Sequence, residues 1–150
     1  MSHSEILERT ASAPEEPAVR ITKTLTVLDA SEVALEAEFW AAMLGGRAVL
    51  ETEGGPFAGW HSVVVDGEAV LGVQPTPDHV PPTWKSEDPA AQRQQIHLDL
   101  YVDHEDAPAA LDETLGLGAR LLEPAEDPSA PGSCHVLADP AGHPFCLCWE

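Results

Sequence analysis

Basic residues are scarce in this chain of 150 residues, which holds 7 Lys and Arg against 26 Asp and Glu, for a formal net charge of −19. Such a surface repels the phosphate backbone of nucleic acids and the anionic surface of membranes. We therefore expect neither nucleic acid nor a membrane as a partner. The charge is typical of a soluble, heavily hydrated surface, and it does not identify a substrate.

Cysteine is rare, and its number, three, is odd. The first residues lack the basic-then-apolar layout of a secretory signal, and no apolar run approaches the ~20 residues of a membrane span. We therefore expect a cytoplasmic protein without a disulfide framework. Cys146 and Cys148 would stand ~6.6 Å apart on one strand, where a bridge between them would be strained.

Alternation of apolar and polar residues predicts a two-faced strand at residues 20–29 and another at 95–103. The apolar face of the first strand holds Ile21, Leu25 and Val27, together with a lysine. The polar face of the first strand carries Thr22, Thr24 and Thr26. The polar face of the second carries His97, Asp99 and Tyr101.

A helical pattern follows each of these strands. In residues 29–46, Asp29 or Ser31 can cap the helix, Trp40 lies on the buried stripe, and Glu32 and Glu36 lie on an exposed face. Two glycines end this helix. The second helix lies within residues 104–119, with Asp106 as a candidate cap before Ala107 and Pro108.

The other segments read as strands, hairpins and a linker. Residues 47–55 and 120–126 predict strands, and residues 60–76 predict a hairpin hinged near Asp66 and Gly67. Residues 133–149 predict a second hairpin, with its turn at 139–142. Residues 77–94 are polar with four prolines and form a linker or a long functional loop, while residues 1–20 predict a flexible tail.

The element order of strand, helix and three strands occurs twice, and the sequence echoes it. "LGGRAVLE" at 44–51 matches "LGARLLE" at 117–123 with one residue deleted. A repeated supersecondary unit is the economical explanation. The sequence therefore predicts an α+β fold of two βαβββ modules that form a paired open-barrel cleft, with module one at 21–76 and module two at 95–150 of a single domain.

The polar strand faces of both modules would line this cleft, which is the default ligand site. Trp60 and Trp84 are candidates for the ligand surface, whereas Trp40 and Trp149 suit the core. The predicted ligand-binding residues are His97, Asp99, Tyr101, Gln74, Trp60, Trp84, Thr24, Cys146 and Cys148.

Three runs, "VLDASEVALEAEFWAAMLG", "QQIHLDLYVD" and "LADPAGHPFCLC", resemble the vicinal-oxygen-chelate superfamily, which includes glyoxalase I, extradiol dioxygenases and bleomycin-binding proteins. The run "VPPTWKSEDPAAQRQQIHLDL" is similar to the glyoxalase-like domain common in actinobacteria. The resemblance covers residues 21–149 and implies the same two-module fold. Homodimers are common in that superfamily, so it also implies a dimer.

In metal-dependent members of the superfamily, four inward residues bind one divalent ion. The resemblance places these positions at Thr22, Gly72, His97 and Cys146, and only His97 keeps the usual residue type. A thiolate in place of a carboxylate would favour zinc or copper(I). The retained His97 therefore favours a metal site, whereas the altered residues at the other three positions disfavour one.

Two functions follow as hypotheses. In the first, the cleft binds a small organic molecule without the usual divalent metal. In the second, the protein is a lyase, isomerase or dioxygenase whose altered metal centre uses His97 and Cys146. A structural or interaction role is a third hypothesis.

The candidate residues also have structural interpretations. His97 could form a hydrogen bond with Asp99 rather than contact a ligand. Cys146 and Cys148 could fill the core or, beside His97, supply a reactive thiol. Cys134 adds a further ligand candidate, but alternation points His135 to the opposite face.

Overall fold

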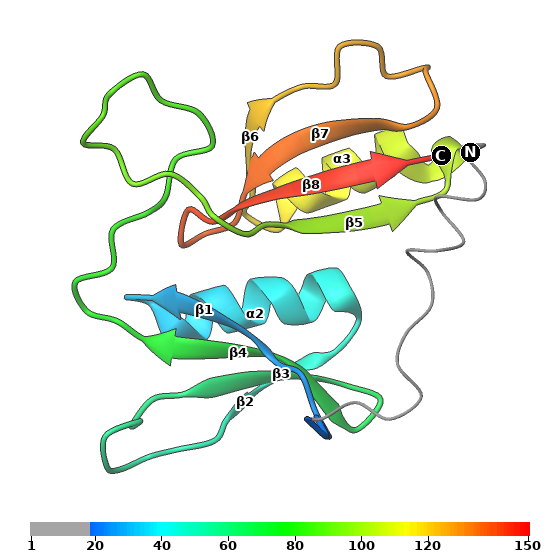
Figure 1. The fold of residues 1–150 in the computed structure, drawn as a ribbon. Coiled ribbons are helices and arrows are strands. Elements are labelled where there is room, and N and C mark those ends of the chain that lie inside the picture. Colours follow the sequence, from blue (N-terminus) through cyan, green and yellow to red (C-terminus); the bar gives the residue numbers. More distant parts are fainter. Residues whose placement is uncertain (1–18) are drawn as a thin grey trace.

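The computed structural model describes residues 19–150, so most of the predicted tail lies outside the described residues. The first module contains five elements. They are β1 (Thr26–Ala30), α2 (Val33–Leu44), β2 (Arg47–Leu50), β3 (His61–Val65) and β4 (Glu68–Pro75). Their sheet has the order β1-β4-β3-β2, in which β1 and β4 run parallel (Figure 1).

The second module repeats this arrangement. It contains β5 (Leu98–Val102), a short 3-10 turn η1 (His104–Asp106), α3 (Ala107–Gly116), β6 (Arg120–Glu123), β7 (Ser133–Ala138) and β8 (Pro144–Trp149). The sheet order β5-β8-β7-β6 and the parallel β5–β8 pair match the first module. The predicted fold of two βαβββ modules, with two open sheets rather than a closed barrel, is therefore confirmed.

Most turn and helix-end predictions hold, and Asp106 is the N-cap residue of α3 as predicted, but neither α2 nor α3 has a side-chain cap hydrogen bond. Asp66 and Gly67 both have positive φ, 50° and 80°, as the tight β3–β4 hairpin requires. Gly45 ends α2 in the left-handed conformation. However, α2 starts after Glu32 without any side-chain cap, because Asp29 belongs to β1.

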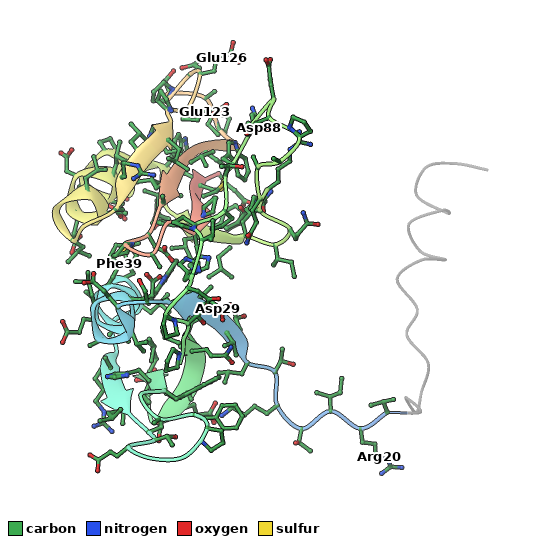
Figure 2. The ribbon with its side chains drawn as sticks, turned by 90° about the vertical axis from the view of Figure 1, so that its left-hand side faces the viewer. Arg20, Asp29, Phe39, Asp88, Glu123 and Glu126 are labelled. Carbon is green, nitrogen blue, oxygen red and sulfur yellow. A yellow bond between two sulfur atoms is a disulfide. The ribbon has the colours of Figure 1, made fainter. Side chains whose placement is uncertain are left out.

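The first predicted strand is shorter than its alternating pattern. Strand β4 offers a partner to β1 only from Thr26 onward, through the pair Thr26–Leu71. The preceding residues therefore stay outside the sheet, and Figure 2 shows Arg20 standing well away from the body of the protein. Ile21 in this segment keeps 74% of its surface exposed.

The two modules meet where α2 contacts the β7–β8 turn. The indole Nε1 of Trp40 donates to Glu36 Oε1 at 3.0 Å and to Asp139 Oδ2 at 2.9 Å. The backbone N–H of Ala141 donates to Glu36 Oε2 at 2.7 Å, and that of His143 donates to Asp139 Oδ1 at 2.8 Å. A buried polar network thus joins a helix of module one to a turn of module two.

The placement of Glu36 on an exposed helix face is wrong, because only 1% of its surface is accessible. Glu32, predicted on the same face, is exposed as expected. The difference comes from the second module, which covers the Glu36 side of α2. Burial, followed by the hydrogen bond and charge of Asp139, raises the pKa of Glu36 from 4.5 to about 9. Glu36 is therefore protonated at neutral pH.

The second sheet holds a disulfide between Cys134 and Cys148. These residues are direct cross-strand partners on β7 and β8, with Cα atoms 4.2 Å apart. The expectation of no disulfide is therefore wrong. The argument from spacing along one strand considered only the pair Cys146 and Cys148. The observed bridge instead joins Cys134 and Cys148, and it depends on how β7 and β8 are aligned. Cys146 remains a free, buried thiol.

Replacing Glu36 is expected to change how stability depends on pH. Unfolded Glu36 loses its proton above pH ~4.5 while the folded protein keeps it, so the free energy of unfolding should fall between pH ~5 and ~9, by at most about 1.4 kcal/mol per pH unit. Glu36→Gln mimics the protonated side chain and should remove this slope. Denaturant unfolding across that pH range measures it, with Glu38→Gln on the exposed face of α2 as the control. An unchanged slope in Glu36→Gln would contradict the account.

The disulfide predicts a simple labelling pattern. Purified protein denatured without reductant should take up one alkyl group, at Cys146, and three after reduction, as read by mass spectrometry. Reduction should lower the free energy of unfolding by about 3 kcal/mol, as expected for a loop of this length. Three alkyl groups without any reductant would show that the bridge is absent.

Candidate functional site

Four predicted ligand residues share the face of the second sheet that lies away from α3. Asp99 pairs with Cys146, and Tyr101 pairs with Cys148. The alternating residues Leu98 and Leu100 point instead into the main core. His97 directly precedes β5, and its Nε2 lies 3.2 Å from Asp99 Oδ1. The structure thus brings His97, Asp99, Tyr101, Cys146 and Cys148 to one surface.

The chemistry of this surface is that of a neutral thiol beside a histidine–carboxylate pair. Burial, followed by the charge and hydrogen bond of Asp99, raises the pKa of Cys146 to about 11. The thiol is therefore protonated at neutral pH and is a poor nucleophile. Cys148 has no free thiol because it is bonded to Cys134.

Trp84, from the proline-rich loop, covers the cysteines of this surface, whereas His97, Asp99 and Tyr101 are exposed. Its side chain packs in one cluster with Val136 and the cysteines of β7 and β8. The Trp84 ring meets the His97 ring edge to face, with centroids 5.1 Å apart. Among the described residues, the indole Nε1 of Trp84 is the single buried side-chain N or O atom without a hydrogen-bond partner.

The ends of the same loop are tied down around Trp84. Lys85 forms an ion pair with Glu123 of β6 at 3.2 Å, and Thr83 and Arg93 form an isolated bridge. The segment predicted as a linker or functional loop therefore folds over the open face of module two.

The first sheet has its own covering tryptophan. Gly72 faces away from α2, and a Cβ atom there would collide with the ring of Trp60. On the same face, Gln74 Nε2 donates to Asp29 Oδ1 at 3.3 Å. Each of the two open sheet faces thus carries an indole ring, Trp60 on one and Trp84 on the other.

The predicted polar face of the first strand is wrong in register. Thr26 pairs with Leu71, which belongs to the core under α2, whereas Val27 and Asp29 pair with Gly72 and Gln74 on the open face. Thr22 and Thr24 are exposed and precede β1. The alternation Ile-Thr-Lys-Thr-Leu-Thr could not reveal which face of β1 is buried, because both faces of β1 carry apolar residues.

A cavity of about 550 Å³ lies between the modules. One wall is β1 of the first module, and the other is formed by the end of the proline-rich loop and the start of β8. Arg93 and three histidines, His79, His97 and His143, contribute to its lining. Of the nine ligand residues predicted from the sequence, His97 lies in this cavity and the others lie outside it.

His79 and His143, which the sequence analysis missed, present a defined hydrogen-bonding pattern. His79 Nε2 donates to the carbonyl oxygen of Ala141 at 2.9 Å, and His143 Nε2 donates to that of Asp29 at 2.7 Å. Since a carbonyl only accepts, Nε2 carries the proton on both rings and Nδ1 of each is an acceptor in the neutral ring. His143 directly follows the Asp139–Gly142 turn, and this turn is the sequence feature that could have identified His143 as a candidate.

The four positions of the family metal site do not fit a divalent ion here. Thr22 precedes β1, Gly72 has no side chain and lies under Trp60, and Cys146 offers a buried sulfur in place of a carboxylate. Two other groups of side chains bring ligand atoms within 4.8 Å of one another. They are His97, Asp99 and Cys146, and Glu36, Asp139 and His143. The carboxyls of the second group already bond to Trp40 and to backbone N–H groups.

Residues 25–148 match the family described as "Glyoxalase-like domain", and the chain belongs to this family. This finding agrees with the resemblance to the vicinal-oxygen-chelate superfamily. A search of curated protein sequences finds no significant match. None of the helices in residues 19–150 is long and apolar enough to cross a membrane.

Solved structures with this fold have low sequence identity to the chain. The fosfomycin resistance protein FosX from Listeria monocytogenes has a TM-score of 0.62 at 10% identity, covering 88% of this chain and 95% of its own. A glyoxalase/bleomycin resistance protein/dioxygenase family enzyme from Burkholderia phytofirmans has a TM-score of 0.56 at 14% identity, covering 82% and 94%. The antibiotic binding protein TnmS3 from a Streptomyces species has a TM-score of 0.52 at 16% identity, covering 90% and 99%.

Removing Trp84 should expose Cys146. In the intact folded protein, Trp84→Ala is expected to raise the rate of Cys146 alkylation about tenfold or more, because the indole covers the thiol and contributes to the burial that raises the pKa of Cys146. The matched control is Trp60→Ala, which uncovers the other sheet and should leave the rate unchanged. Timed alkylation at pH 8 with mass detection measures this. Equal rates in the two variants would refute the covering role of Trp84.

Proposed function

We propose that the chain forms a single glyoxalase-like domain over residues 21–150, which binds a small organic molecule between its modules without the family's divalent metal. The observation that carries this proposal is the cavity of about 550 Å³, whose size is typical of ligand pockets. Its position between the two βαβββ modules supports a ligand that contacts both.

The lining of the cavity suits an organic molecule with apolar and polar parts. Apolar surface comes from both modules, through Leu25, Leu28, Ile96 and Phe145. The Nδ1 atoms of His79 and His143 offer acceptors, and Arg93 and His97 offer donors. A ligand that carries both a donor group and an acceptor or anionic group would pair with both sets.

The remaining predicted residues form an extension of this site in the proposal. Asp99, Tyr101 and Cys146 lie next to His97 on the open face of the second sheet. Trp84 shields Cys146 on that face, and its unpartnered N–H makes its covering position less stable than a fully paired one. A ligand larger than the cavity would therefore reach the exposed Asp99 and Tyr101 directly and would reach Cys146 by displacing Trp84.

A homodimer is part of the proposal. Ile21 and Ile96 expose 74% and 85% of their surfaces, near the edge strands β1 and β5. Apolar residues beside an unpaired sheet edge favour pairing with another chain. The second copy is the occupant that this proposal assigns to these edges, and sedimentation analysis of the full chain tests it.

A metal-dependent lyase, isomerase or dioxygenase is the second candidate. It is favoured by one observation, the proximity of His97, Asp99 and Cys146, whose ligand atoms lie within 4.8 Å of one another. A structure of a FosX mutant, with a TM-score of 0.62 at 12% identity, is described as complexed with Mn(II) and a dihydroxypropylphosphonic acid. In this chain the donors include a sulfur, which suits zinc better than manganese.

Metal analysis separates the two candidates. Protein purified without chelators or affinity metals is expected to contain no stoichiometric Zn, Mn, Ni or Fe by mass spectrometry, and added ions should not shift its melting temperature. Stoichiometric metal that is lost in His97→Ala would overturn the proposed function in favour of the enzyme.

A ligand screen then tests the cavity. Compounds that raise the melting temperature should lose at least tenfold in affinity when Arg93→Ala removes the cation from the cavity wall. Arg47→Ala, an exposed arginine on β2, is the matched control and should bind as the wild type does. Screening hits that bind both variants equally would place the ligand elsewhere.

A further inference from the structure

The three cysteines gather on the open face of the second sheet, and they differ in chemistry and in exposure. Cys134 and Cys148 share the disulfide, and Cys146 keeps a free thiol two residues before Cys148 on β8. Cys148 is buried, with 1% of its surface accessible, whereas Cys134 on β7 is half-buried. Cys134 is therefore the half of the bridge that a thiol from solution reaches more easily.

The free thiol of Cys146 leaves the neighbouring bridge intact. Attack on a disulfide requires a thiolate. Burial, followed by the charge of Asp99, raises the pKa of Cys146 to about 11, so very little of it is a thiolate at neutral pH. Cleavage of the bridge must therefore come from a thiol in solution.

Trp84 is the side chain that a change at the bridge would displace. Its ring packs on the cluster that holds Cys134, Cys146, Cys148 and Val136. The buried Nε1–H of Trp84 has no hydrogen-bond partner. When the ring leaves its position, this N–H gains a hydrogen bond to water, which reduces the free-energy cost of moving it.

Reduction of the bridge increases the space that the sulfurs need. Two thiol groups cannot stay at bonding distance, so the side chains of Cys134 and Cys148 must move apart. Buried groups that need more room force their neighbours to shift. The backbones of β7 and β8 are held by continuous pairing, whereas Trp84 belongs to a loop. The indole is therefore the neighbour that moves.

We propose that the Cys134–Cys148 bridge is an exchange site for low-molecular-weight thiols, and that its reduction releases the Trp84 cover. The thiolate of a small thiol attacks Cys134 Sγ, the S–S bond breaks, and Cys148 Sγ leaves as a thiolate and takes up a proton. A second small thiol attacks the mixed disulfide and releases Cys134, which is protonated in turn. The small thiols are oxidised to their own disulfide, and the bridge gains two electrons.

Release of the cover also changes the proposed ligand site. The rings of Trp84 and His97 meet edge to face with centroids 5.1 Å apart, and His97 lines the cavity between the modules. Reduction therefore uncovers Cys146 and removes the aromatic contact of His97. This last consequence rests on the proposed function, whereas the exchange and the release of Trp84 do not.

Hydrogen exchange at the indole N–H of Trp84 tests the release in the folded full chain. We expect this N–H to exchange about tenfold faster or more after dithiothreitol reduces the bridge, because the cover opens more often. The indole N–H of Trp40, bonded to Glu36 and Asp139, is the internal control and should keep its exchange rate. An unchanged Trp84 rate in protein whose bridge is reduced would overturn the proposal.

The route of exchange is tested on the same oxidised protein. Dithiothreitol should reduce the bridge without denaturant. Acid-quenched reactions with excess glutathione should carry the mixed disulfide on Cys134, as mapped by mass spectrometry. A bridge that is reduced only in denaturant, or glutathione found first on Cys148, contradicts the proposal.

A double variant, Cys134→Ala with Cys148→Ala, shows whether dithiothreitol acts through the bridge. Dithiothreitol should leave the Trp84 exchange rate of this variant unchanged, and an acceleration like that of the wild type would overturn the proposal. The wild-type measurements with Trp40 as control stand alone if the variant does not fold. None of these readouts depends on a ligand, so their failure would leave the proposed function intact.

Discussion

The contact on which this structure depends is the protonated carboxyl of Glu36 held against Asp139 under the indole of Trp40. It is the place where α2 of module one meets the β7–β8 turn of module two. Two carboxyls so close could not both be ionised without strong repulsion, so one of them keeps its proton. The indole N–H and backbone N–H groups then satisfy the remaining oxygens, which makes this polar junction compatible with burial.

The cavity between the modules is a consequence of this junction. The same turn that receives Glu36 carries His143, whose ring reaches across to the backbone of Asp29 at the end of β1, and it accepts a hydrogen bond from His79 at Ala141. Figure 2 shows Asp29 and Phe39 on the side of module one that faces module two. The residues that fix the relative position of the modules thus also form one end of the proposed ligand site.

Each module keeps an open sheet face, but a tryptophan covers it. Trp60 fills the space that Gly72 leaves, and Trp84 covers Cys146 and the Cys134–Cys148 disulfide. On module one, Trp60 covers Gly72, which is a metal-ligand position according to the resemblance to the superfamily. On module two, Trp84 encloses the thiol of Cys146, whose pKa is raised. These two coverings are the physical basis for proposing a binding protein rather than a metalloenzyme.

Much of the fold was predictable from the sequence because it depends on local patterns. The repeated strand–helix–strand order, the Asp66–Gly67 turn and the alternation that groups Asp99 and Tyr101 with Cys146 and Cys148 all emerge from neighbouring residues. The failures concern contacts between distant segments. Glu36 looks exposed until the second module covers it, and the disulfide needs the β7–β8 register. The threonines of residues 22–26 suggest a polar face only if β1 is assumed to begin earlier than its partner allows.

The most direct test of the central claim is ligand binding in the presence of a strong chelator. A compound selected by thermal shift should give saturable NMR shifts at His79 and His143, with the same dissociation constant with and without EDTA. That result is predicted because the protein's own side chains form the site. Binding that disappears with EDTA and returns with a divalent ion would contradict the account.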